Sequence, residues 1–213
     1  MTKIMILGAH GAMARILTDR LLNETDVTLT LFLRDTARLN QYANNDRVTL
    51  VEGDVNDTAT VAGAMADADI IYSNLGGQDL DVQIQSVIDA MHQTNKQRLI
   101  YISSLGAQNE VRGKFGEWNE RMIGAYLPAF RKTADLVAKS GVTFTEIRPA
   151  WLTNNDEVDY ETLTVAEGFK GTEVSRQSVA DFAFNVIQAP DTFQNASVGL
   201  DKAGTAGDQP SWM

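Results

Sequence analysis

Short apolar segments alternate with segments of helical periodicity along the first 150 residues of the chain. The apolar segments, which we expect to be β-strands, are Ile4–Leu7, Val27–Leu33, Val48–Val51, Ile70–Ser73, Leu99–Ser103 and Val142–Ile147. Helices are expected over Ala12–Leu22, from near Asp35, and over Thr58–Ala66, Asp79–Thr94 and Trp118–Ser140. Strands that are apolar nearly throughout are typical of a parallel sheet with both faces covered. The sequence therefore predicts an α/β protein with a doubly wound, mostly parallel sheet and helices on both faces.

The pattern becomes less regular after Pro149. We expect strands over Thr162–Val165 and Val198–Leu200, the second closing the edge of the sheet, and a helix over Ser178–Gln188. Residues 201–213 are rich in Gly, Ala, Asp and Pro, so we expect them to be loosely held. A chain of 213 residues has the length of one domain. We predict a single domain over 1–213, in which 150–213 forms a smaller, irregular substrate-side region with a loose tail.

Composition excludes several classes of protein. The chain has 18 Lys and Arg against 28 Asp and Glu, a net charge of −10, which disfavours nucleic acid and anionic membranes as partners. It has no cysteine, so disulfides, thiolate metal centres and cysteine nucleophiles are excluded, and its two histidines are too few to predict a metal site. The apolar run before Gly8 is too short for a signal peptide or a membrane span. We therefore expect a cytoplasmic protein without a metal.

A glycine-containing turn joins the first predicted strand to the first helix. Gly8, Gly11 and Ala14 give the spacing G-x-x-G-x-x-A. A dinucleotide diphosphate needs a tight turn, a close backbone approach and a helix N-terminus directed at its charge, and small residues at this spacing meet these needs. The alternative is a turn that only connects the two elements. The context favours a Rossmann fold in which the cofactor-binding residues of this turn are Gly8, His10, Gly11, Ala12 and Met13.

The end of the second predicted strand indicates which dinucleotide is bound. Arg34 lies 23 residues after Gly11, and Arg38 follows one helical turn later. An arginine at this place faces the 2′-phosphate of NADP, whereas an acidic residue binds the ribose hydroxyl of NAD. We therefore predict NADP(H) rather than NAD(H), bound by Arg34 and Arg38. Two alternatives stay open: Asp35 caps the following helix beside a solvated Arg34, or Asp35 binds the ribose.

With these residues in place, the chain resembles the atypical short-chain dehydrogenases/reductases. More narrowly, it is similar to a group of small NAD(P)-binding proteins that includes the NmrA-like regulators, the NADH-flavin reductases and biliverdin reductase B. The resemblance covers about Lys3–Leu152 well and the rest more loosely. The segments that carry it are Gly8–Gly11, Gly53–Val55, Asn74–Gly77, Tyr101–Ala107 and Thr145–Leu152.

The resemblance implies further cofactor contacts and partners. Asp54 and Val55 would lie beside the adenine, and Asn74, Leu75 and Gly76 would run past the ribose. The remaining cofactor contacts that it implies, toward the nicotinamide, are Ile102, Ala150, Trp151 and Leu152. The expected partner is a small-molecule substrate or a flavin. By the same resemblance the helices over 79–94 and 118–140 would pair two copies into a homodimer, although a monomer is equally compatible.

The acid–base residues of this family are incomplete in the chain. Members that reduce carbonyls use a serine after the fifth strand and a Tyr-x-x-x-Lys on the next helix; Ser103, Ser104 and Tyr126 hold the serine and tyrosine positions, but Phe130 replaces the lysine. A tyrosine without a cation keeps a pKa near ~10, which is poorly matched to proton transfer at neutral pH. Two hypotheses remain. The chain is an oxidoreductase that transfers hydride between NADP(H) and a flavin, quinone or carbonyl, or it is a non-catalytic NADP(H)-binding redox sensor.

Overall fold

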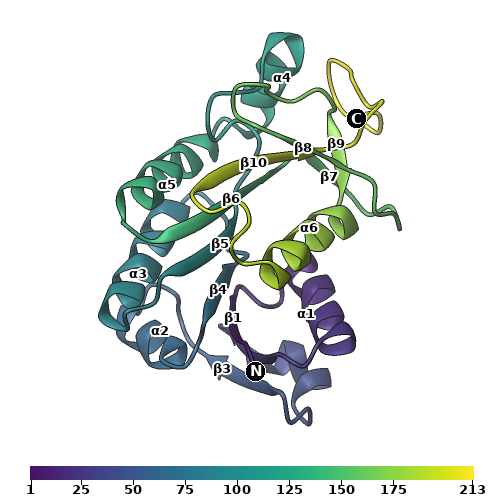
Figure 1. Ribbon diagram of the computed structural model, residues 1–213. Coiled ribbons are helices and arrows are strands. Elements are labelled where there is room, and N and C mark those ends of the chain that lie inside the picture. The colour runs from purple at the N-terminus through teal and green to yellow at the C-terminus, as the bar shows by residue number, and fades with distance from the viewer.

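The computed structural model describes all 213 residues and has an eight-stranded sheet at its centre (Figure 1). Its strands are β1 (Lys3–Leu7), β2 (Thr28–Leu33), β3 (Val48–Glu52), β4 (Ile70–Ser73), β5 (Arg98–Ile102), β6 (Thr143–Pro149), β8 (Glu161–Leu163) and β10 (Ala196–Asp201). The strand order is β3-β2-β1-β4-β5-β6-β10-β8, and every neighbouring pair is parallel except β10 and β8. The predicted doubly wound, mostly parallel sheet is confirmed.

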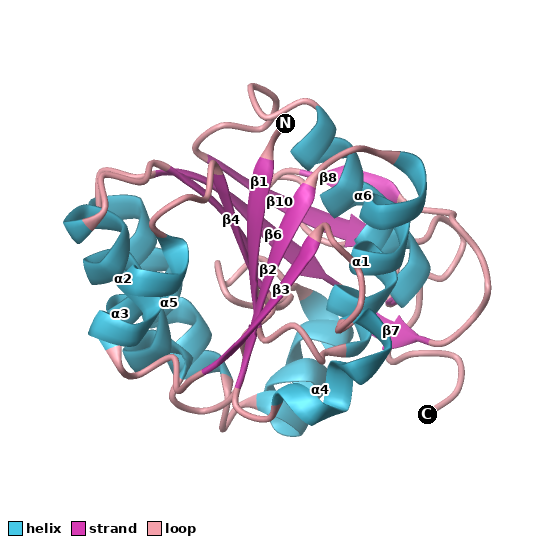
Figure 2. Cartoon of the chain, turned by 90° about the horizontal axis from the view of Figure 1, so that it is seen from below, coloured by secondary structure: helices cyan, strands magenta, loops and turns pink.

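Helices cover both faces of this sheet (Figure 2). On one face lie α1 (Ala12–Glu24), η1 (Thr36–Tyr42, a 3-10 helix) and α6 (Arg176–Gln188); on the other lie α2 (Thr58–Met65), α3 (Leu80–Gln93) and α5 (Leu127–Lys139). The helix α4 (Gly113–Ile123) lies apart from these layers, near the C-terminal end of the chain. None of the helices combines the length and the apolar character needed to cross a membrane.

The alternation of side chains along β1 explains the two apolar cores. Ile4 and Ile6 point into the core beneath α1 and α6, whereas Met5 and Leu7 point into the core beneath α2, α3 and α5. Successive strand residues face opposite sides of a sheet, so a strand that is buried on both sides must be apolar at every position. All four side chains are at most 1% exposed. This burial holds the carboxyl end of β1, and the turn that follows it, in a fixed place.

The helix predicted over 118–140 is two helices, and the prediction of one continuous helix was wrong. The first, α4, ends at Ile123, and α5 begins at Leu127 with Pro128 in its first turn. A proline inside a helix clashes with the carbonyl group four residues earlier, here that of Gly124, whereas it is well accommodated in a first turn. Tyr126 therefore lies at the N-cap of α5 and is 44% exposed.

The C-terminal region differs from the prediction in three ways. β10 lies between β6 and β8, so the antiparallel strand β8 forms the edge in place of the 198–200 segment. Two short strands that were not predicted, β7 (Trp151–Thr153) and β9 (Glu173–Ser175), pair in a separate parallel sheet. The tail, expected to be loose, is held by hydrogen bonds from Ser211 to Glu173 and by an ion pair of Asp208 with Lys114 at 3.2 Å.

Candidate functional site

The turn between β1 and α1 is built around a close approach of the segment after β4. Gly8 has a φ of +67°, and a Cβ atom there would lie 2.8 Å from the carbonyl oxygen of Asn74. A Cβ atom on Gly11 would lie 2.0 Å from the side-chain nitrogen of Asn74. Gly8 therefore requires glycine, whereas a side chain at Gly11 would have to displace the side-chain amide of Asn74. Ala14 has no exposed surface, which lets α1 lie close to the sheet.

The N-terminus of α1 is available to an anion. Gly11 is its N-cap, and no side chain caps the helix by a hydrogen bond. The first N–H groups of a helix have no partner within it and carry a partial positive charge. An anionic group placed at this turn would accept hydrogen bonds from them, as diphosphates do at such turns.

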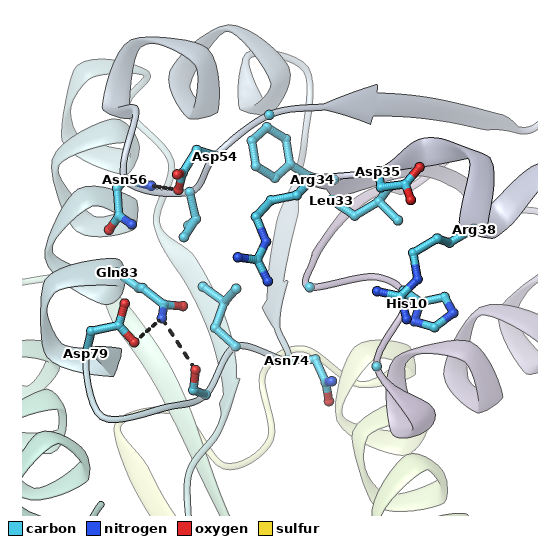
Figure 3. Close-up of a pocket in the computed structure, with 17 residues that line it drawn as sticks. His10, Leu33, Arg34, Asp35, Arg38, Asp54, Asn56, Asn74, Asp79 and Gln83 are labelled. Carbon is cyan, nitrogen blue, oxygen red and sulfur yellow. Dashed lines mark hydrogen bonds between the residues drawn. The ribbon is translucent and has the colours of Figure 1, made fainter.

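A cavity of about 440 Å³ opens from this turn across the carboxyl ends of β1 to β4. Ten of the predicted cofactor-binding residues line it: Gly8, His10, Gly11, Arg34, Arg38, Asp54, Val55, Asn74, Leu75 and Gly76. In Figure 3, the Arg34 side chain extends into the middle of the cavity, while Arg38 lies beside the His10 ring at one end. These residues come from four separate segments, and the fold brings them together as the sheet topology requires.

Positive charge gathers at one end of this cavity. Burial lowers the pKa of His10 from its usual value, and the charges of Arg38 and Arg15 lower it further, while Asp35 opposes them. The side chain of Asp35 accepts a hydrogen bond of 3.2 Å from the N–H of Ala37, so Asp35 caps η1 as one of the alternatives supposed. A group with negative charge would be stabilised at this end of the cavity.

The opposite end of the cavity is polar and internally hydrogen-bonded. Asp54 accepts a hydrogen bond of 2.9 Å from the N–H of Asn56. Gln83 donates to Asp79 at 2.7 Å and to the carbonyl of Gly76 at 3.4 Å (Figure 3). The segment that carries Gly76 is thereby fixed to the start of α3.

Sequence reasoning missed several residues of the cavity wall. They are Phe32, Leu33, Gly53, Asn56, Asp79 and Gln83. The first four adjoin residues that were predicted, so the neighbourhood of Arg34 and Asp54 was the available signal. Asp79 and Gln83 reach the cavity because α3 begins beside it, and this placement depends on the fold.

Six of the predicted cofactor residues do not line this cavity: Ala12, Met13, Ile102, Ala150, Trp151 and Leu152. Met13, Ile102 and Ala150 are buried among apolar side chains. Ile102 is the last residue of β5, and Ala150 follows β6, so both lie at the same carboxyl edge of the sheet. Their assigned contact with the cofactor stays a prediction.

The loop after β5 carries the candidate serines and is held rigidly. The N–H of Ser103 donates to the carbonyl of Ile147 at 2.7 Å, and its buried hydroxyl has no hydrogen-bond partner. The carboxylate of Glu110 accepts hydrogen bonds from the N–H groups of Gly106 and Gln108 at 3.1 and 2.9 Å. The Ser103 hydroxyl is therefore a buried polar group without a partner inside the protein.

Tyr126 has no cation beside it. Its hydroxyl makes no hydrogen bond, and Phe130, one turn later, packs against the core. The nearby cations are engaged elsewhere: Arg131 donates to the carbonyl of Gly106 at 3.1 Å, and Lys132 forms an ion pair with Asp81 at 2.6 Å. Neither Arg131 nor Lys132 therefore replaces the missing lysine.

Fold and cavity together define a dinucleotide-binding protein of the Rossmann type. The sequence matches the model of the NAD(P)H-binding family over residues 8–190, and the chain belongs to this family. The expected similarity to short-chain dehydrogenases/reductases is confirmed at this level. No curated protein matches the sequence.

Several solved structures are similar over the whole chain. A short-chain dehydrogenase/reductase of the wide type from Veillonella parvula, in complex with NADP, has 29% identity and a TM-score of 0.93, with 99% of each chain covered. A Rossmann-fold NAD(P)-binding family protein from Shigella flexneri has 38% identity and a TM-score of 0.85, with 100% of each chain covered. ChuY, an anaerobilin reductase from Escherichia coli O157:H7, has 19% identity and a TM-score of 0.81, covering 97% of this chain and 100% of that one; it shares the fold.

Proposed function

We propose that the chain is an NADPH-dependent reductase that transfers hydride to a small acceptor. The observation that carries the proposal is the cavity in which an uncapped helix N-terminus lies next to Arg34, Arg38 and His10. These groups fit the two anionic parts of NADPH. The amides at the start of α1 would bind the diphosphate, and the two guanidiniums would bind the 2′-phosphate.

The preference for NADPH over NADH rests on the two arginines. A guanidinium offers several N–H donors in a planar fork that matches a phosphate group. Asp35, the residue that would bind the ribose of NAD, uses its carboxylate to cap η1. The similar structure from Veillonella parvula is in complex with NADP, which supports the same preference here.

The acid–base residues narrow the class of acceptor. When bound, NADPH supplies a hydride from its nicotinamide ring. Tyr126 is exposed and no cation lies beside its hydroxyl, so the site lacks the tyrosine–lysine pair that donates a proton in carbonyl reduction. We propose an acceptor that needs little help from an enzymic acid, such as a flavin or a quinone, with solvent or the hydroxyl groups of Ser103 and Ser104 supplying protons; a carbonyl is the less favoured acceptor.

The experiment measures binding and turnover with both dinucleotides. Arg34→Ala and Arg38→Ala should each weaken NADPH binding by about 10-fold to 100-fold, because a charge-assisted hydrogen bond is lost, and should change NADH binding much less. Arg121→Ala, an exposed arginine on α4, is the matched control and should change neither. Equal losses for the two dinucleotides in the Arg34 variant would contradict the assignment.

A second candidate function is an NADP(H)-binding redox sensor of the NmrA-like type. The replacement of the family lysine by Phe130 favours it, because a sensor needs the nucleotide site without the acid–base pair. NADPH oxidation with FMN, a quinone and a panel of small aldehydes separates the two. Turnover that is lost in Gly11→Asp supports the reductase, whereas tight NADPH binding with no turnover on any acceptor supports the sensor.

A further inference from the structure

The C-terminal segment 208–213 is tied to a buried carboxylate. The N–H and the hydroxyl of Ser211 donate to the two carboxylate oxygens of Glu173, at 3.1 and 3.0 Å. Glu173 is only 9% exposed, and a buried carboxylate is costly unless it is hydrogen-bonded. The segment therefore supplies hydrogen bonds that β9 requires. The segment also forms an ion pair between Asp208 and Lys114, but this pair is exposed and contributes little to the stability of the attachment.

This attachment places Trp212 against Trp151. Glu173 lies directly opposite Trp151 in the β7–β9 pair, so two consecutive residues of the tail contact two facing residues of the same short sheet. The rings of Trp151 and Trp212 have centroids 6.3 Å apart at 61°, an edge-to-face arrangement. Trp212 remains 50% exposed, so part of its ring is open to a further contact.

Trp151 belongs to a longer row of aromatic rings. Its centroid lies 4.7 Å from that of Trp118, which in turn lies 6.1 Å from that of Phe115 in a stacked pair. The indole N–H of Trp151 donates to the side-chain oxygen of Asn119 at 2.9 Å, which fixes the orientation of the ring. Trp212 is the last and most exposed member of this aromatic row, Phe115–Trp118–Trp151–Trp212.

The aromatic row adjoins the loop that carries the candidate serines. Trp151 is separated from the end of β6 by a single residue, at the carboxyl edge of the sheet where the cofactor cavity also lies. The N–H of Leu105, next to Ser104, donates to the carbonyl of Pro149 at 3.2 Å. A Cβ atom on Gly106 would lie 3.1 Å from the side chain of Asn119. The row and the serine loop are thus packed against each other through Asn119, which contacts both Trp151 and Gly106.

We propose that Trp212 determines acceptor specificity and that segment 208–213 is the latch that holds it at the acceptor site. The proposal rests on the proposed reductase function and names the acceptor class as planar conjugated rings, such as the isoalloxazine of a flavin or the ring of a quinone. Such rings pack against indole groups in the edge-to-face or offset geometry that the row already shows. The hydrogen bonds of Ser211 to the buried carboxylate of Glu173 hold this latch closed and keep Trp212 beside Trp151.

The test compares Trp212→Ala with Trp212→Phe and with Met213→Ala, the control at the next, equally exposed position. The dissociation constant of FMN is measured by calorimetry on protein saturated with NADP, and KM values are measured for FMN, for a quinone and for a small aliphatic aldehyde. We expect Trp212→Ala to weaken FMN binding and to raise KM for the two ring acceptors by about 5-fold to 10-fold. The phenylalanine variant should stay within about twofold of wild type. NADPH affinity and KM for the aldehyde should not change.

Two results would overturn the proposal: wild-type protein that does not bind FMN, or the same FMN affinity in Trp212→Ala as in wild type. Failure of the reductase function gives a different pattern. In that case FMN binds and Trp212→Ala weakens FMN binding, but no acceptor is reduced. This result would support the aromatic binding site and contradict the proposed reductase function. Ser211→Ala tests the latch separately, because it keeps the Trp212 side chain but removes one hydrogen-bond donor to Glu173. It should weaken FMN binding, though less than Trp212→Ala does.

Discussion

The carboxylate of Glu110 and the guanidinium of Arg148 form an ion pair in which neither side chain has any exposed surface. Arg148 also donates to the hydroxyl of Ser197 at 2.8 Å and to its carbonyl at 3.3 Å. Glu110 binds the amides of the loop after β5, so the pair fastens the candidate serine loop to β6 and, through Ser197, to β10. One buried charge pair thus anchors the loop of the candidate serines to the sheet.

Glu110→Ala should therefore lower the free energy of unfolding by about 3–5 kcal/mol, because it leaves a buried guanidinium without its counter-charge. Urea denaturation followed by circular dichroism measures the change. Lys114→Ala, which removes an exposed ion pair, is the control and should remain close to wild type. A Glu110→Ala variant as stable as wild type would mean that the pair does not anchor the loop.

The glycine turn gives a prediction with a control in the same chain. Gly8→Ala places a Cβ atom 2.8 Å from the backbone carbonyl oxygen of Asn74, at a φ of +67°. It should weaken NADPH binding at least 10-fold and destabilise the fold by about 1–2 kcal/mol. Gly63→Ala adds a Cβ in α2 with nothing within 4 Å, and should leave binding unchanged and stabilise the protein by about 0.5–1 kcal/mol. Titration calorimetry and urea denaturation test both variants, and a Gly8→Ala protein with normal affinity would contradict the close approach of Asn74.

The first half of the fold could be predicted because its signals are local. Each strand from β1 to β6 is an apolar run that ends at a turn, and the glycine turn and Arg34 follow such runs directly. The first six strands lie where the runs predict them, to within one or two residues. Ten residues of the cavity were predictable for the same reason, since they follow strand ends that a parallel sheet gathers at one edge.

The parts of the structure that the sequence did not predict depend mostly on contacts between distant segments. β7 and β9 are three residues long, and the segment between them contains β8, which pairs in the other sheet; no periodicity marks either β7 or β9. The tail is held by the buried carboxylate of Glu173, whose position requires that pairing. The break before α5 had a local signal in Pro128, but the apolar spacing around it resembles a single helix.

Tyr126→Phe should change kcat with FMN or a quinone by no more than about twofold. The tyrosine hydroxyl is exposed, makes no hydrogen bond and has no cation to stabilise its ionised form, so little proton transfer depends on it. Steady-state oxidation of NADPH, with kcat and KM reported separately, measures the effect. A loss of about 100-fold would show that Tyr126 is a general acid despite the missing lysine.

Binding of the 2′-phosphate should be linked to protonation of His10. Burial and the charges of Arg38 and Arg15 hold the pKa of His10 below its usual value, so the ring is neutral at pH 7 in the unliganded protein. A phosphate at this end of the cavity would raise that pKa, and a proton would be taken up on binding. Affinity for NADPH should therefore increase as the pH falls from 8 to 6, more steeply in wild type than in His10→Gln. Calorimetry in buffers of different ionisation enthalpy measures the proton uptake, and equal slopes in the two proteins would exclude His10 as its source.

Asp201 should make the stability of the fold depend on pH in the opposite direction to that expected for most carboxylates. One of its oxygens accepts hydrogen bonds from the N–H groups of Lys170 and Gly171, at 2.8 and 2.5 Å, and the other has no partner. Burial raises the pKa of Asp201, and Glu161, opposite it across the β10–β8 pair, raises it further.

Because the folded protein keeps this proton to a higher pH than the unfolded chain does, Asp201 stabilises the fold most below its usual pKa, and this contribution is lost as the pH rises through the raised value. Asp201→Asn keeps an acceptor for the two amides and does not ionise. The stability of wild type relative to Asp201→Asn should therefore fall between pH 4 and pH 8, whereas relative to the exposed control Asp156→Asn it should stay constant. Urea denaturation at a series of pH values measures both differences in the free energy of unfolding. If the stability of wild type relative to Asp201→Asn increased as the pH rises, the fold would prefer the ionised carboxylate.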